Sequence, residues 1–134
     1  MRVIIDANVA IAAVASRGLC EALLELCLEH HQVVLCAGIL EEIEEKLARK
    51  LKVPSSVIAD YLHVLRANAE ILEPERVEKS VCRDPDDLMV LGLVGPGRAE
   101  VIITGDADLL VLERFKTARI VSPRTFWERS KRTE

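Results

Sequence analysis

Aromatic side chains are scarce in this sequence, at 3% of 134 residues. Proteins that stack single-stranded bases on aromatic platforms need more of them, so we do not expect that mode of binding.

No apolar run approaches the ~20 residues of a membrane-spanning helix. The first residues already lead into a predicted strand, so we expect no signal peptide and interpret the chain as a cytoplasmic protein without a membrane partner.

Cysteine is present, but without the spacing of a zinc site. The four cysteines include no Cys-x-x-Cys pair, and we expect them to be reduced and buried: Cys20, Cys27, Cys36 and Cys82. The sequence also lacks Gly-x-Ser-x-Gly, Walker and dinucleotide-binding motifs. Serine-triad and nucleotide-cofactor chemistry are therefore poorly supported.

The overall charge does not identify a partner. A net charge of −4 argues weakly against nucleic-acid binding, since proteins that bind nucleic acid are usually basic. If several acids are concentrated at one site, however, the remainder becomes slightly basic, and a bound divalent cation shifts the balance further. The length of 134 residues, half of them apolar, predicts a single domain over residues 1–134 with its own core.

Apolar runs without polar alternation predict strands that are covered on both faces, as in a parallel sheet. They occur at residues 2–5, 33–36, 101–104 and 119–121, with a short edge strand at 69–72. Helical periodicity lies between them, at about residues 9–14, 20–30, 38–51, 55–65, 84–94, 109–113 and from 123 onward. This alternation predicts an α/β fold, a three-layer α/β/α sandwich around a central parallel sheet.

Three details of the helices are further expectations. Leu51 falls on the apolar stripe of the third helix. Gly95-Pro96-Gly97 should end the buried helix that follows Asp84. The charged tail from Glu128 to Glu134 should fray.

Acidic residues follow two of the predicted strands. Asp6 comes directly after the first strand, and Asp106 follows the strand at 101–104. The carboxyl ends of parallel strands share one edge of a sheet, and ligands bind there in open α/β folds. Like charges held close together need a cation or raised pKa values. Carboxylate oxygens favour Mg²⁺ or Mn²⁺ over zinc.

Each acid also has a purely structural interpretation. Asp84 before Pro85 is a good helix N-terminus, and Asp106 suits the N-cap of the next helix. The glutamates at 41–45 are most often a solvated helix face. Asp6 has the weakest structural alternative, because it caps nothing obvious except the turn that follows it.

Five motifs occur together in one order along nearly the whole chain. They are Val-Ile-Ile-Asp6-Ala-Asn8-Val, Ile-Leu-Glu-Glu42-Ile, Cys-Arg-Asp84-Pro-Asp-Asp87, Ile-Thr104-Gly-Asp106-Ala-Asp108-Leu-Leu and Ile-Val-Ser-Pro123-Arg-Thr-Phe126. With these motifs the sequence resembles PIN-domain ribonucleases, specifically their small prokaryotic toxin-like branch. The third and fourth motifs are fairly specific, whereas the glutamate motif is loose by itself.

The resemblance implies metal-dependent cleavage of RNA phosphodiester bonds with Mg²⁺ or Mn²⁺. It implies a small antitoxin as partner and a homodimer. By position in the motifs, the catalytic residues are Asp6, Glu42, Asp87 and Asp106. The implied metal ligands are Asp6, Asp87, Asp106 and Asp108. Asn8 and Thr104 are implied to orient these side chains.

The sequence departs from the family pattern at two places. Ala7 follows the first aspartate, where a threonine is usual, so one hydroxyl near the site is missing. The glutamate helix begins with Ala37-Gly38, where Ser-Pro is common, so this helix loses its usual cap. We expect these departures to affect affinity and stability more than the type of reaction.

We expect basic side chains to hold RNA by its backbone, although each of them could equally be a solubilising charge. The candidates are Arg17, Lys46, Arg49, Lys50, Lys52 and Arg124.

Two other functions stay open. A haloacid-dehalogenase-type phosphohydrolase also uses a strand-end aspartate, but it needs a second aspartate where this chain has Asn8. The second is a catalytically weak domain that binds RNA or protein.

Overall fold

The structure is a computed structural model and describes residues 1–132. These residues form a six-stranded sheet in the order β3-β2-β1-β4-β6-β5. The strands are β1 (Arg2–Ile5), β2 (Gln32–Leu35), β3 (Ala69–Ile71), β4 (Val101–Ile103), β5 (Arg114–Phe115) and β6 (Ala118–Val121). The helices are α1 (Ala7–Ala15), α2 (Leu19–His30), α3 (Ala37–Arg49), α4 (Ser55–Ala67), α5 (Pro85–Gly92), α6 (Val94–Gly97), α7 (Ala107–Leu110) and α8 (Pro123–Arg132).

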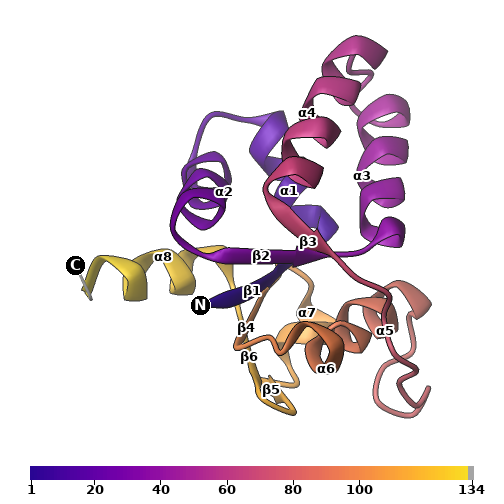
Figure 1. Cartoon of the computed structure of the whole chain (residues 1–134), viewed down its shortest axis with the longest axis vertical. Coiled ribbons are helices and arrows are strands. Elements are labelled where there is room, and N and C mark those ends of the chain that lie inside the picture. Colours follow the sequence, from indigo (N-terminus) through magenta and orange to yellow (C-terminus); the bar gives the residue numbers. More distant parts are fainter. Residues whose placement is uncertain (133–134) are drawn as a thin grey trace.

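Helices cover both faces of the sheet, which confirms the predicted three-layer α/β/α sandwich (Figure 1). In this view α1 to α4 lie above the sheet and α5 to α7 lie below it. The central strand β1 pairs in parallel with β2 and β4. Its side chains Val3, Ile4 and Ile5 are at most 1% exposed, as expected for an apolar strand between two helical layers.

The strand register brings the ends of the central strands to one edge. Ile5 pairs with Ile103, and Ile103 pairs with Val121, all in parallel strands. The residues that follow these positions therefore leave the sheet side by side. Asp6 and Thr104 both lie at this carboxyl edge, next to each other.

The central sheet is parallel from β3 to β6, as predicted, and one further edge strand that was not predicted makes the whole sheet mixed. β5 pairs with β6 in antiparallel orientation through Arg114 and Phe115. The chain turns back within a few residues because Glu113 and Lys116 adopt left-handed backbone conformations, with φ of 61° and 51°. Neither is glycine or asparagine, the residues that usually mark such turns, so the sequence contained no clear signal for this strand.

Three details of the helices also differ from the predictions. Gly95-Pro96-Gly97 does not terminate the buried helix but lies within the separate short helix α6. Leu51 follows the end of α3 and is 42% exposed, so it is not part of the apolar stripe. The predicted frayed tail is helical through Arg132, and its last two residues, 133–134, lie outside the described residues.

The cysteines are reduced, as predicted, but not all of them are buried. All four are free thiols, of which Cys27, Cys36 and Cys82 are buried and Cys20 is partly exposed. No helix within residues 1–132 combines the length and the apolar character needed to cross a membrane.

Candidate active site

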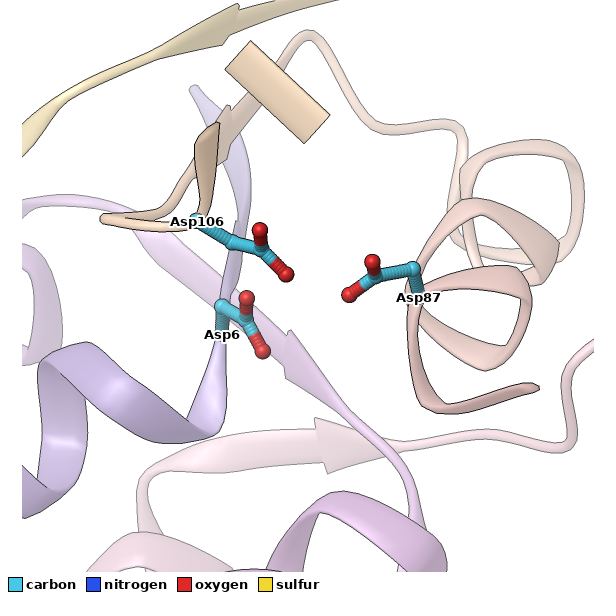
Figure 2. Close-up of side chains that lie close together, drawn as sticks. All are labelled: Asp6, Asp87 and Asp106. Atoms are coloured by element: carbon cyan, nitrogen blue, oxygen red, sulfur yellow. The ribbon is translucent and has the colours of Figure 1, made fainter. Parts of the chain in front are cut away.

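Three carboxyl groups meet at the carboxyl edge of the sheet. Asp6 follows β1, Asp106 follows the neighbouring strand β4, and Asp87 points toward both of them from the first turn of α5 (Figure 2). One oxygen from each of the three lies within 4.8 Å of the others. Asp6 and Asp87 are buried and Asp106 is half-buried. Residues that are far apart in the sequence thus form one anionic centre, which we call the acidic cluster.

Asp6 is held in place by three hydrogen-bond donors. The backbone N–H of Ala7 donates to its Oδ1 at 2.8 Å. The hydroxyl of Thr104 donates to its Oδ2 at 2.7 Å, and the amide of Asn8 donates to the same oxygen at 3.0 Å. A buried carboxylate needs such donors, because burial without partners is strongly unfavourable. Asp6 is also the N-cap of α1, so its backbone is fixed as well.

The same polar side chains connect Asp6 to the loop that carries Asp106. The backbone N–H of Asp106 donates to the Thr104 hydroxyl at 3.0 Å, and the N–H of Gly105 donates to Asn8 Oδ1 at 3.0 Å. Thr104 is fully buried. Asn8 and Thr104 therefore have the contacts that an orienting role needs, and that role remains a prediction.

Asp87 reaches the cluster because of how α5 begins. Asp84 is the N-cap, and its Oδ1 accepts the N–H of Asp86 at 2.9 Å, with Pro85 in the first turn. The structural interpretation of Asp84 as a cap is thus correct. Asp87 sits one turn further and is 4% exposed. The thiol of Cys82 donates to Asp87 Oδ2 at 3.5 Å.

The electrostatic environment disfavours negative charge at the cluster. Burial raises the pKa of Asp6, and the hydrogen bonds from Thr104, Ala7 and Asn8 only partly offset this rise. Burial and, to a smaller extent, the neighbouring Asp106 carboxyl together raise the pKa of Asp87 to about 7. Ionising all three carboxyls therefore requires a compensating positive charge.

The donor set fits a hard divalent cation. The oxygens of one Mg²⁺ shell lie at 2.0–2.1 Å from the ion and hence up to about 4 Å apart, close to the spacing of the acidic cluster. The nearest sulfur does not compete, because burial raises the pKa of the Cys82 thiol and keeps it protonated. Three carboxylates without histidine or thiolate favour Mg²⁺ or Mn²⁺ over zinc.

Glu42 and Asp108 lie outside this group of three. Glu42, on α3, has a side chain 18% exposed and pairs with Lys46 at 3.6 Å. Burial and the nearby Asp86 carboxyl raise its pKa, Lys46 lowers it, and Asp6 adds a smaller rise, so Glu42 borders the cluster. Asp108 is exposed, and its backbone N–H donates to Asp106 Oδ1 at 2.9 Å. Their roles as catalytic residue and metal ligand stay predictions.

The predicted RNA-binding side chains do not gather at one place. Arg17 is exposed at the end of α1 opposite Asp6, so a nine-residue helix of about 14 Å separates it from the cluster. Arg49 pairs with Glu45 at 3.5 Å, and Arg124 lies 4.0 Å from Glu128. Lys50 and Lys52 follow α3, at the end remote from Glu42. Lys46 pairs with Glu42 beside the site, and Arg124 follows β6 at the same carboxyl edge of the sheet. The contacts of these side chains with RNA stay predictions.

Cys82 is the site residue that sequence reasoning missed. Its thiol touches Asp87, although it lies in the loop before α5 and was expected only to be buried. No spacing rule connects a cysteine with an aspartate five residues later.

Asp86 was considered only for helix capping, whereas its carboxyl faces Glu42 closely enough to raise the pKa of that residue.

Carboxylates that meet at the carboxyl edge of a largely parallel α/β sheet lie where ligands bind in this class of proteins, and they suit a divalent cation. The family model described as PIN domain matches residues 2–108. The chain therefore belongs to the PIN-domain family, and membership of this family indicates nuclease activity in general. No match was found among curated proteins.

The fold is also similar to a solved structure. It superposes on a chain in the crystal structure of VapBC2 from Rickettsia felis bound to a DNA fragment from their promoter, with a TM-score of 0.62. The similarity covers 91% of this chain and 98% of the other, at 14% sequence identity. At this identity the similarity supports the fold, including the arrangement of the strands that position the acidic cluster.

Proposed function

We propose that this protein is an Mg²⁺- or Mn²⁺-dependent endoribonuclease that cleaves RNA phosphodiester bonds. The acidic cluster is the observation that carries the proposal, because its three converging carboxylates are the donor set of a hard-cation site. PIN-domain membership supports it independently. A phosphohydrolase that uses Asp6 as nucleophile is less well supported, because its motif needs a second aspartate where this chain has Asn8, whose amide instead donates to Asp6 Oδ2.

In this mechanism Asp6, Asp87 and Asp106 hold the cation, with Glu42 at the margin of the site. The bound cation supplies Lewis-acid chemistry, by lowering the pKa of water and by neutralising charge on the phosphate. Thr104 and Asn8 keep the Asp6 carboxyl in one orientation, which limits the reorganisation needed during reaction. The Cys82 thiol fixes Asp87 Oδ2 without itself becoming an anion.

We further propose that the protein is the toxin of a toxin–antitoxin pair, that it acts in the cytoplasm and that it forms a homodimer. The similarity to a chain of the VapBC2 complex supports a protein partner. The residues proposed to hold the RNA backbone are Arg17, Lys46, Arg49, Lys50, Lys52 and Arg124, of which Lys46 pairs with Glu42 at the margin of the site.

The experiment that tests the nuclease proposal is cleavage of a labelled single-stranded RNA with Mg²⁺, Mn²⁺ or EDTA. The wild-type protein should cleave with either metal and lose activity in EDTA. Asp6→Asn removes one charged ligand while keeping similar size and should reduce the cleavage rate by at least about a hundredfold. Asp60→Asn, an exposed aspartate of α4, is the matched control and should cleave like wild type.

Equal cleavage by wild type and Asp6→Asn would indicate a contaminating nuclease and refute the proposal. Cleavage of single-stranded DNA at the rate of RNA would refute the RNA specificity but not the nuclease class. Turnover of a chromogenic phosphate monoester, without RNA cleavage, would instead support the phosphohydrolase.

A further inference from the structure

Two hollows beside α8 lie apart from the acidic cluster and share no lining residue with it. The larger measures about 660 Å³ and has apolar walls that include Leu26 and Phe126. The other measures about 560 Å³ and reaches Leu110 on α7. They lie next to each other along β6 and are together called the β6 groove here, because both are lined by Arg114, Arg119, Val121 and Arg129.

The arginines of the β6 groove are arranged in a way that the isolated protein does not explain. Arg114 and Arg119 are directly opposite each other in the antiparallel β5–β6 pair, so their side chains leave the same face. Like charges in this position destabilise a sheet. Both are exposed, and within residues 1–132 no carboxylate lies at ion-pair distance from either. Arg129 adds a third guanidinium from α8.

Acidic residues are present at the β6 groove but do not neutralise this pair. Glu100 lines the larger hollow, and its Oε1 accepts the backbone N–H of Arg2 at 3.1 Å. Glu113 lines the smaller hollow. The opposed Arg114 and Arg119 therefore favour an anionic ligand that bridges them.

The walls favour a peptide over RNA. The aromatic ring of the groove, Phe126, is 3% exposed and lies edge-on to His31 with 5.7 Å between ring centroids, so it offers no open face for base stacking. Most of the exposed wall of the larger hollow is apolar, which suits apolar side chains. β6 has four residues, so the groove extends over about 13 Å, the length of a short extended segment.

From this geometry we propose that the β6 groove binds a segment of a partner protein in which acidic and apolar side chains alternate. The acidic side chains bind Arg114 and Arg119, and the apolar ones enter the hollows beside Phe126 and Leu110. This inference does not depend on the nuclease proposal, because none of the three clustered aspartates lines the groove.

The test measures binding of a short fluorescein-labelled peptide, in which glutamate and leucine alternate, to the full chain by fluorescence anisotropy. The double variant Arg114→Glu/Arg119→Glu should weaken binding by at least about tenfold, the size expected when a central arginine contact is lost. Arg66→Glu, an exposed arginine on α4, is the matched control and should bind like wild type. RNA cleavage should be the same in all three proteins.

A milder variant separates the loss of peptide binding from a loss of the folded state. Arg119→Gln relieves the like-charge pair, so it should weaken peptide binding while leaving the melting temperature equal or higher. Equal binding of a lysine-for-glutamate or a serine-for-leucine peptide would overturn the proposal. So would binding of single-stranded oligouridylate that depends on Arg114 and Arg119 and exceeds peptide binding, because the groove would then be an RNA track.

Discussion

At the scale of single residues, Asp6 combines two opposing effects. Burial raises its pKa, and three hydrogen-bond donors lower it without cancelling that effect. The donors also fix the direction of the carboxyl toward Asp87 and Asp106 (Figure 2). The hydrogen bonds therefore fix the orientation of the Asp6 carboxyl, while burial disfavours its charged form. This combination suits a metal ligand, because a bound cation would stabilise the negative charge.

Asp87 gives a testable pH dependence for the metal-free protein. Its pKa rises from 3.8 to about 7 on folding. Between these values the folded state binds more protons than the unfolded state, so the free energy of unfolding should fall as pH rises from about 4 to about 7. Asp87→Asn cannot ionise, so it should lose most of this slope and be more stable than wild type at pH 7.

The measurement is urea denaturation in EDTA at a series of pH values. Asp60→Asn serves as the control and should keep the wild-type slope. A slope that is identical in wild type and Asp87→Asn would show that Asp87 does not titrate in this range.

At the scale of elements, the position of α5 decides whether Asp87 reaches the strand ends. Two contacts involve this helix. On α3, Gly38 lies against the sulfur of Met89, the far end of a flexible side chain. At the C-terminal end of α5, the N–H of Glu75 donates to Gly92 O at 2.9 Å, and this backbone contact holds the helix more firmly.

Gly92→Ala should therefore destabilise the protein. The new Cβ would collide with the backbone oxygen of Glu75 and lie 2.9 Å from Pro74 Cβ, and a backbone cannot move aside as a flexible side chain can. We expect a loss of about 1–3 kcal/mol, the usual cost of overpacking. Thermal or urea unfolding measures it.

Gly18→Ala provides the comparison, because nothing lies within 4 Å of its added Cβ. It should cost no more than about 1 kcal/mol, the ordinary effect of alanine at a helix N-cap. A Gly92→Ala protein as stable as Gly18→Ala would show that the 74–75 segment yields easily and does not hold α5.

At the scale of the whole molecule, the acidic cluster joins three separate parts of the fold. Asp6 and Asp106 belong to neighbouring central strands, and Asp87 belongs to the helical layer below them (Figure 1). A cation that binds all three carboxylates connects these parts, so metal binding and global stability should be linked.

Mg²⁺ or Mn²⁺ should therefore raise the melting temperature of the wild-type protein. At a metal concentration one hundred times the dissociation constant, the gain is about 2.7 kcal/mol, or roughly 10 °C for a chain of this size. Asp106→Asn should remove most of this shift, and Asp60→Asn should retain it. The measurement is calorimetry with metal and with EDTA. An equal metal-induced shift in Asp106→Asn would place the cation elsewhere.

The sequence by itself determined the layers of this protein and the edge on which its site lies. Apolar runs such as Val3-Ile4-Ile5 can be stable only between two layers, and the carboxyl ends of parallel strands must meet, so Asp6 and Asp106 had to be neighbours. The N-cap role of Asp84 was also readable, because capping depends on local residue types.

Only the tertiary structure decided which acids meet. Asp87 joins the cluster while Glu42 borders it and Asp108 faces solvent, because the positions of α5, α3 and α7 relative to the strand ends depend on packing between residues remote in the sequence. The opposed arginines of the β6 groove arise from a two-residue strand that no local pattern signals. Periodicity reports which face of an element is buried, whereas the distance between two elements depends on side chains that are remote in the sequence.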